Sequence, residues 1–184
     1  MQVFFKIFLE YFFIDFYIYI MGVDRSLRIV EYNRNKAIEY AKKWAYGRNP
    51  KYYNFDNLGG DCTNFISQCL YNGSKVMNYK KDIGWYYING NDKSPSWTGV
   101  EFLYKFITQN NGVSIFGKEV MESEIEIGDV IQLSFDGSNF GHSLILVNKN
   151  EMTVAAHTFN TYNRKLSSYS YEKARFIHIE GVRK

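Results

Sequence analysis

The stretch that decides the fold of this chain reads Gly59-Gly60-Asp61-Cys62-Thr63-Asn64-Phe65-Ile66-Ser67-Gln68-Cys69-Leu70. The glycine pair makes a flexible entry, an acidic residue follows, and the residues from Cys62 onwards have helical periodicity. The pattern predicts a helix over 62–71 with Cys62 in its first turn. The unpaired N–H groups and the helix dipole at that end favour an anion, so a thiolate there is stabilised and becomes a usable nucleophile.

A nucleophilic thiol needs a base, and the chain has three histidines, His142, His157 and His178. His142 opens a strand-like run over 142–148, whereas His178 lies within an alternating strand and is interpreted as surface or core filler. A cysteine at a helix start and a histidine on a later strand is the layout of papain-like cysteine hydrolases. We therefore expect a cysteine amidase or peptidase in which His142 is the base.

His157 ends the next predicted strand, 153–157. Two adjacent antiparallel strands joined by a short turn bring their far ends side by side, so His142 and His157 should be neighbours. We expect His157 to orient the imidazole of His142, with Asn160 as the alternative. The backbone N–H of Cys62 is the expected first oxyanion donor.

The second oxyanion donor is left open by the sequence. The polar groups available in the loop before the helix are those of Asn54, Asn57 and Asp61. None of these three is favoured over the others by its residue type or spacing.

Composition and charge exclude several classes of protein. The 184 residues, 46% hydrophobic and 18% aromatic, suffice for one domain with a core. The net charge of +3 is small and spread along the chain, so a nucleic-acid partner is not indicated. Cys62 and Cys69 lie roughly 10 Å apart along one helix, too far for a disulfide. The histidine spacing does not resemble a zinc site, so we expect neither a metal nor a cofactor.

Hydrophobic periodicity predicts an α+β fold, with helices first and antiparallel strands after them. The predicted helices span 32–46, 62–71 and 97–108. The predicted strands span 130–135, 142–148, 153–157 and 175–182.

The N-terminal residues differ in composition from the rest of the chain. Residues 3–21 are rich in Phe, Ile and Tyr but are interrupted by Lys6, Glu10 and Asp15. A signal peptide, a membrane anchor, a peripherally packed helix and translation from Met21 all remain open. A signal or anchor would make the protein secreted or bound to the cell envelope, with membrane contact through 3–21; otherwise it would be cytoplasmic. We treat 1–21 as a separate segment and 32–184 as the domain.

The block Asp61-Cys62-Thr63-Asn64-Phe65-Ile66-Ser67-Gln68-Cys69-Leu70 resembles the hallmark of the putative amidase domain family (amidase_6 type), a relative of the NlpC/P60 and CHAP cysteine hydrolases. Other stretches of the chain agree with the family. They are Tyr32-Asn33-Arg34 with Ala37 and Trp44, Ser96-Trp97-Thr98, Gly128-Asp129-Val130-Ile131-Gln132, Gly141-His142-Ser143, Ala156-His157-Thr158 and Leu166-Ser167. Lys165 departs from the pattern, because a proline often precedes this late Leu-Ser. The match covers about 32–179.

The resemblance implies a papain-like, NlpC/P60-like fold with N-terminal helices packed on an antiparallel sheet. It implies Cys62 as nucleophile, His142 as base and His157 as the third polar residue, and a cell-wall peptide or peptidoglycan as substrate. Further candidates for substrate binding or the oxyanion hole are Asp61, Asn57, Trp97 and Asn160. Two alternatives are acyl transfer on the same Cys-His pair and a non-catalytic cell-wall-binding module.

Overall fold

A computed structural model describes residues 27–184, and the predictions for residues 1–21 lie outside the described residues. Four helices precede most of the strands. They are α2 (Arg34–Trp44), α3 (Cys62–Ser74), α4 (Pro95–Thr98) and α5 (Val100–Gln109), with two short 3-10 helices, η1 (Glu122–Glu124) and η2 (Leu166–Ser168).

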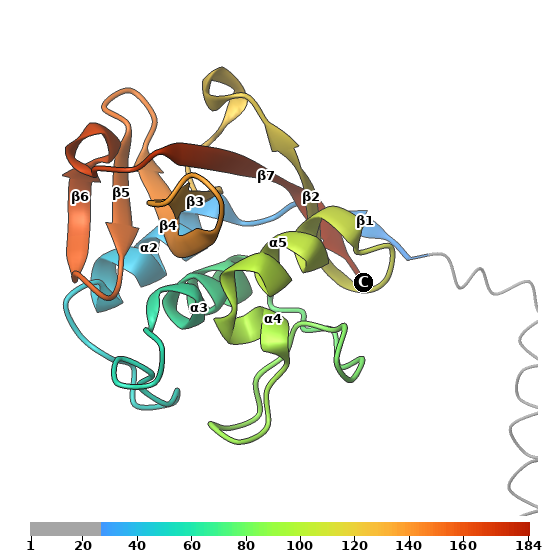
Figure 1. Cartoon of the computed structure of the whole chain (residues 1–184). Coiled ribbons are helices and arrows are strands. Elements are labelled where there is room, and N and C mark those ends of the chain that lie inside the picture. Colours follow the sequence, from blue (N-terminus) through green and yellow to red (C-terminus); the bar gives the residue numbers. More distant parts are fainter. Residues whose placement is uncertain (1–26) are drawn as a thin grey trace, which may run out of the picture.

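Seven strands form one antiparallel sheet. They are β1 (Ile29–Val30), β2 (Ser114–Val120), β3 (Val130–Ser134), β4 (Phe140–Asn148), β5 (Thr153–Ala156), β6 (Thr161–Lys165) and β7 (Lys173–Arg183). The order is β1-β7-β3-β4-β5-β6, and β2 also pairs with β7. Helices α3, α4 and α5 lie together on one side of this sheet (Figure 1).

The helices form where the sequence supplies apolar faces and caps. The side chain of Asn33 caps α2 by accepting a hydrogen bond from the backbone N–H of Lys36 at 3.0 Å. Ala37 and Ala41, one turn apart on α2, are fully buried. Helix α3 ends at Lys75, whose φ of 57° places it in the left-handed conformation that commonly terminates helices.

The third predicted helix, 97–108, is wrong in its start and its continuity. Helix α4 begins at Pro95, and an extended Gly99, with φ −103° and ψ 129°, separates it from α5. Gly99 is both the C-cap of α4 and the N-cap of α5. The spacing of apolar residues does not reveal this bend, because a buried residue lies on each side of it, Trp97 in α4 and Leu103 in α5.

The sheet divides the apolar core into two clusters. Ile145 and Ala155, which are register partners on β4 and β5, pack with the helices in the larger cluster. Leu144 and Leu146 belong to the smaller cluster on the opposite face, together with Leu166 of η2. This division follows the period of two in a strand, in which successive side chains point to opposite faces.

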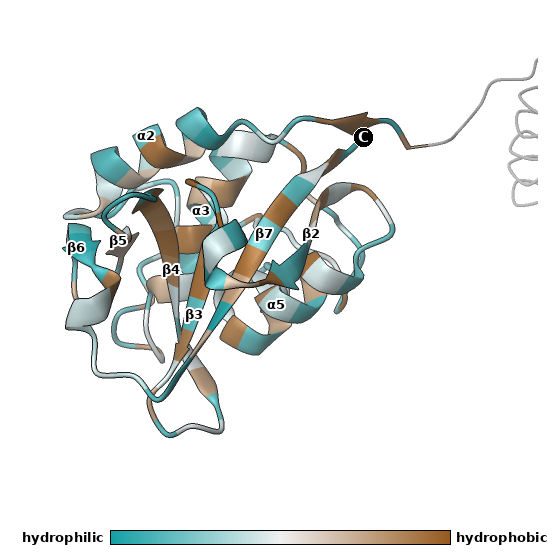
Figure 2. Ribbon diagram, turned by 90° about the horizontal axis from the view of Figure 1, so that it is seen from above, coloured by the Kyte–Doolittle hydropathy of each residue, from teal (hydrophilic) through white to brown (hydrophobic). Residues whose placement is uncertain are grey.

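Strands β1, β2 and β6 are absent from the sequence prediction. Strand β6 at the sheet edge carries the polar sequence Thr161-Tyr162-Asn163-Arg164-Lys165 and is hydrophilic in Figure 2, whereas β4 is hydrophobic. Charged edge strands are a common protection against unwanted strand pairing. The predicted α+β class with an antiparallel sheet is nevertheless confirmed. Within residues 27–184, no helix is both long and apolar enough to span a membrane.

Candidate active site

Cys62 is the first residue of α3, as the sequence predicts. Its side chain is 7% exposed, and its Sγ lies 3.8 Å from Thr63 Oγ1. Thr63 Oγ1 in turn lies 3.0 Å from Ser143 Oγ, which ties the start of α3 to strand β4. The second thiol, Cys69, is fully buried, and this burial raises its pKa well above the ordinary value.

Cys62 and His142 line the same pocket, which has a volume of about 480 Å³. The loop before α3, the start of β4, the loop after β5, strand β6 and the segment around η2 all contribute to its wall. The lining residues are Gly59, Gly60, Cys62, Phe135, Gly141, His142, Thr158, Phe159, Arg164, Ser168, Tyr169 and Ser170. The tertiary structure thus brings the predicted nucleophile and base to one cavity from positions 80 residues apart.

Gly59 and Gly60 form the wall next to the thiol, and both have positive φ, +90° and +103°. This conformation is accessible to glycine and is costly for other residues. The glycine pair therefore serves a defined bend at the pocket wall. A second cavity of about 410 Å³ is also lined by these two glycines, together with Tyr53 and Lys93.

His142 is 6% exposed and lies between two aromatic rings, with centroid distances of 6.3 Å to Phe135 and 6.2 Å to Tyr169. Burial, and secondly the charge of Arg164, lower its pKa to about 4. The imidazole is therefore neutral at pH 7 and can accept a proton. Its Nε2 is buried and has no hydrogen-bond partner among residues 27–184.

No hydrogen bond joins Cys62 to His142 in the described part of the chain, where the hydrogen-bond partner of Cys62 Sγ is Thr63 Oγ1. Catalytic hydrogen bonds are often long or poorly aligned in free enzymes and tighten when substrate binds. The shared pocket, rather than a formed hydrogen bond, is what relates the two residues.

The predicted contact between His157 and His142 is wrong. His157 Nδ1 lies 2.7 Å from Asp61 Oδ2, and Nε2 lies 2.9 Å from the carbonyl oxygen of Trp44. Both partners are acceptors, so each ring nitrogen donates when the ring carries both protons. The ring also stacks on Phe65 of α3 with a centroid distance of 3.8 Å. Neither ring nitrogen is left to orient His142.

Strand parity explains the error. Strands β4 and β5 are antiparallel neighbours, and Ile145 is opposite Ala155. His157 has the parity of Ala155 and therefore faces the helices, whereas His142 has the parity of Leu144 on the opposite face. The two histidines thus lie at the same end of the two strands but on opposite faces of the sheet.

Asp61 lies at the centre of a buried network rather than in the pocket wall. Its carboxylate accepts hydrogen bonds from the backbone N–H of Phe55 at 3.0 Å and from Asn64 Nδ2 at 2.8 Å, and it pairs with Arg48 Nε at 3.2 Å. Together with His157, these contacts fix the loop that leads into Cys62. An ionised carboxylate only accepts hydrogen bonds, so Asp61 is unsuited to be an oxyanion donor.

The other candidate residues also lie outside the pocket wall. Asn57 is exposed, as is Asn54, whose Oδ1 accepts a hydrogen bond from the backbone of Asp56. Asn160 is exposed, and its Oδ1 accepts a hydrogen bond from Arg48 Nη2 at 3.0 Å instead of contacting His142. Trp97 is fully buried, and its Nε1 donates to Asn64 Oδ1 at 2.9 Å. Of the residues proposed from the sequence, Cys62 and His142 line the pocket.

Phe135, Arg164 and Tyr169 also line the pocket and were not among the residues predicted from the sequence. Phe135 lay at the end of a predicted strand and received no functional interpretation. Arg164 belongs to β6 and Tyr169 follows η2, and neither element was predicted. An isolated arginine in a polar stretch gives no signal of its own, so this part of the site emerges only from the fold.

A second polar cluster lies away from this pocket. Arg34 pairs with the buried Asp129 at 2.6 Å, and His178 Nδ1 lies 2.7 Å from the other oxygen of that carboxylate. Arg34 also donates to the carbonyl oxygen of Ile179 at 2.7 Å. His178, interpreted from the sequence as surface or core filler, is therefore part of an ion-paired link between α2, the turn before β3, and β7.

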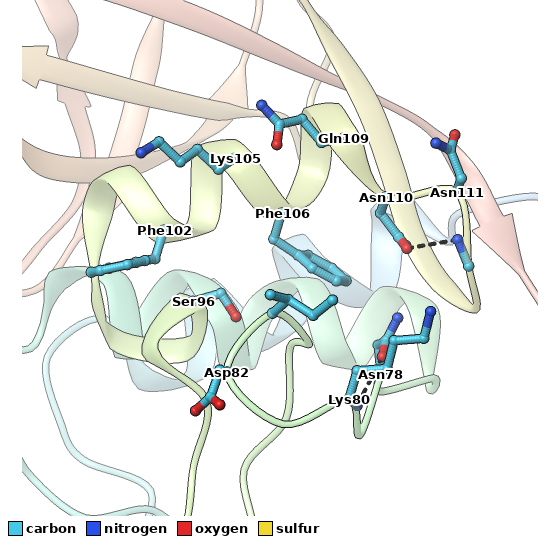
Figure 3. A pocket seen from close by; sticks show the side chains of 12 residues that line it. Asn78, Lys80, Asp82, Ser96, Phe102, Lys105, Phe106, Gln109, Asn110 and Asn111 are labelled. Atoms are coloured by element: carbon cyan, nitrogen blue, oxygen red, sulfur yellow. Dashed lines mark hydrogen bonds between the residues drawn. The ribbon is translucent and has the colours of Figure 1, made fainter.

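A larger cavity, of about 620 Å³, lies elsewhere, between α5 and the loop around residues 78–83. Figure 3 shows Phe102, Lys105 and Phe106 of α5 on one side of it. No cysteine or histidine lines this cavity, so it lacks the groups for thiol chemistry.

Within residues 27–184, no cluster of three or more histidine, cysteine or carboxylate groups is arranged to hold a metal ion.

Comparison with known proteins agrees with the sequence resemblance. Residues 31–180 match the family described as "Putative amidase domain". The chain is 34% identical over 149 residues to "Uncharacterized protein YhbB" of Bacillus subtilis (strain 168). The match covers 79% of this chain and 46% of that relative, so the chain spans less than half of the relative's length. No solved structure matches the chain. The chain therefore belongs to the "Putative amidase domain" family.

Proposed function

We propose that this protein is a cysteine amidase in which Cys62 is the nucleophile and His142 the general base. The observation that carries the proposal is the pocket that Cys62, at the first turn of α3, shares with His142 of β4. A cysteine-bearing helix packed on an antiparallel sheet that carries the histidine is also the papain-like arrangement, and we propose that relationship for the fold.

The chemistry proceeds in two stages. His142, neutral at pH 7, takes the proton of the Cys62 thiol as Sγ attacks the amide carbon, and the N–H of Cys62 stabilises the oxyanion. His142 then gives this proton to the leaving amine, and the C–N bond breaks to leave a thioester. Water attacks the thioester carbon and loses a proton to His142. The carboxylic acid is released, and the thiol is restored with that proton.

The proposed substrate class is a cell-wall peptide, or the bond that joins such a peptide to glycan. This choice rests on the resemblance to NlpC/P60 and CHAP hydrolases. The structure supports it through two cavities that share Gly59 and Gly60 in their walls, one of which is also lined by Cys62. An extended peptide could occupy both cavities.

The test is hydrolysis of purified peptidoglycan fragments, followed by mass spectrometry of the products and of the protein. We expect new carboxyl and amine ends, and an acylated peptide that contains Cys62 when the reaction is quenched early. Cys62→Ala should abolish both signals, and His142→Ala should nearly do so. Cys69→Ala is the matched control and should keep both, because Cys69 lies in the core.

Two outcomes would redirect the proposal. Transfer of the acyl group to an added amine in preference to water would identify an acyltransferase on the same residues. Binding of the fragments without any bond cleavage, unchanged in Cys62→Ala, would identify a non-catalytic cell-wall-binding module.

A further inference from the structure

Arg164 is a charged residue of the pocket wall and makes no ion pair within residues 27–184. It projects from the edge strand β6 into the wall of the cavity that contains Cys62 and His142. Its positive charge acts on the base itself, since it is the second cause that lowers the pKa of His142. A cation at this position affects any charged group that enters the pocket.

The guanidinium of Arg164 is held in one orientation. Nε donates to Ser168 Oγ at 2.8 Å, and Nη2 donates to the carbonyl oxygen of Ser168 at 3.0 Å. The carbon of the guanidinium lies 3.9 Å from the centroid of the Tyr169 ring. A guanidinium has five N–H donors, and these contacts use two of them. Arg164 makes no other hydrogen bond in the described part of the chain, and its guanidinium is already ordered before a ligand arrives.

Three other arginines of the fold are paired with carboxylates, whereas Arg183 donates to the carbonyl oxygen of Asn110 and lies over the Phe116 ring. Arg34 pairs with Asp129, Arg48 with Asp56 and Asp61, and Arg175 with Glu101. Within residues 27–184, no carboxylate lies within ion-pair distance of Arg164. Its two hydrogen-bond acceptors are both uncharged oxygens of Ser168.

We propose that Arg164 forms a carboxylate-binding subsite, so that the preferred substrate is an amide with a free carboxylate close to the bond that is cleaved. The planar fork of a guanidinium matches the two oxygens of a carboxylate, and such charge-assisted bonds are stronger than neutral ones. Phe135 and Phe159, 52% and 71% exposed, are apolar parts of the same pocket wall and provide contacts for the uncharged part of the substrate. This inference rests on the proposed role of Cys62.

The test compares thiol reagents that differ only in charge. Iodoacetate and N-iodoacetylglycine carry a carboxylate at two distances from the reactive carbon, and iodoacetamide and N-iodoacetylglycinamide are their neutral counterparts. The rate of Cys62 modification by each reagent is measured by mass spectrometry in the intact chain. For each pair, the rate with the anionic reagent is divided by the rate with its neutral counterpart. This ratio is then divided by the ratio measured with glutathione, a free thiol, so that the difference in intrinsic reactivity between the two reagents cancels.

We expect a normalised ratio of about ten or more for at least one anionic reagent, because a charged hydrogen bond to the carboxylate orients it. Arg164→Gln should reduce the ratio to about one. Arg164→Lys should give an intermediate value, because it keeps the charge but loses the fork. Lys105→Gln, which removes a positive charge from the wall of the separate cavity at α5, should leave the ratio unchanged.

The neutral reagent is the internal control for folding and for the state of the thiol, because a change in either alters its rate and the rate of the anionic reagent alike and leaves their ratio unaffected. A ratio near one in the unaltered chain, or a high ratio that survives in Arg164→Gln, would refute the subsite while leaving the cysteine amidase proposal intact. Failure of every reagent to modify Cys62 faster than Cys69 would refute both.

Discussion

At the residue scale, the site depends on two side chains whose surroundings differ from those of their counterparts elsewhere in the chain. Cys62 begins a helix at a pocket wall, whereas Cys69 lies inside the core. His142 is buried with an unpartnered Nε2 among the described residues, whereas His157 has both nitrogens bonded. Residue type alone does not distinguish the two cysteines or the two histidines. The surroundings of each side chain determine the chemistry that is open to it.

The two thiols should differ in reactivity. We expect iodoacetamide to modify Cys62 far faster than Cys69 at pH 7, because Cys69 is inaccessible and burial raises its pKa. Peptide mapping after timed alkylation of the native protein measures both rates. Cys69→Ser should leave the Cys62 rate unchanged. Equal labelling of the two thiols would contradict the assignment of Cys62 as nucleophile.

His142 should make stability depend on pH in a defined window. Its pKa is lowered from 6.5 to about 4 in the folded protein, so between these values the unfolded chain binds a proton that the folded chain does not. The stabilisation is complete above pH 6.5 and is lost as the pH falls towards 4, up to about 3 kcal/mol in total. Urea unfolding of the unaltered chain and of His142→Gln from pH 4 to 7 measures the difference.

The slope of the free energy of unfolding against pH should be smaller in His142→Gln across that window. Identical slopes in the two chains would show that His142 titrates normally in the folded state. The same neutral imidazole should extend the acid limb of kcat/KM well below pH 6.5, once a substrate is identified.

At the scale of elements, two buried polar networks connect helices, strands and loops. The network of Asp61, Arg48 and His157 joins the loop before α3 to the end of β5 and, through the carbonyl of Trp44, to the end of α2. The second network joins Arg34 of α2 to Asp129 before β3 and to His178 of β7. Asp61 and His157 are 96 positions apart, and Arg34 and Asp129 are 95 positions apart, so both networks join segments that are distant in sequence.

His157→Gln should therefore act through stability. Loss of the bonds to Asp61 and to the Trp44 carbonyl should cost about 1–3 kcal/mol, because a buried carboxylate loses a donor. Urea unfolding measures this cost. In the folded variant, the acid limb of kcat/KM should keep its position, since His157 does not contact His142. A shifted acid limb at unchanged stability would restore His157 as the orienting residue.

Asp129→Asn should lower the free energy of unfolding more than His157→Gln does. It removes the charge between Arg34 and His178 in a fully buried position, and breaking such a pair typically costs about 3–5 kcal/mol. Glu180→Gln is the matched control, because its pair with Lys118 is partly exposed and should contribute less than about 1 kcal/mol. Thermal melting or urea unfolding compares the two, and equal effects would contradict a structural role for the buried pair.

At the scale of the whole molecule, the described residues contain both apolar clusters and the candidate site. The core residues run from Tyr32 to Val182, and the pocket lies between Gly59 and Ser170. We expect a chain starting at Met21 to fold and to keep the reactivity of Cys62. Thermal melting and iodoacetamide labelling of the two chain lengths test this. A collapse of the shorter chain would mean that residues before Met21 are an integral part of the core.

The sequence by itself determined the α+β class, the family and the position of Cys62 at a helix start. These features are local, because they depend on periodicity, on capping and on a contiguous motif around one residue. The same local signals indicated the central strands β3, β4, β5 and β7, although not their limits. Short or polar elements such as β1 and β6 gave too little hydrophobic contrast to be detected.

Only the tertiary structure decided which residues share the pocket. His142 and His157 end up on opposite faces of the sheet because a strand alternates its side chains, and the pairing register of β4 with β5 sets those faces. Arg164 and Tyr169 enter the site through an edge strand and the segment after it, which no local pattern links to Cys62. Contacts across such distances arise from packing and register, which a single stretch of sequence does not encode.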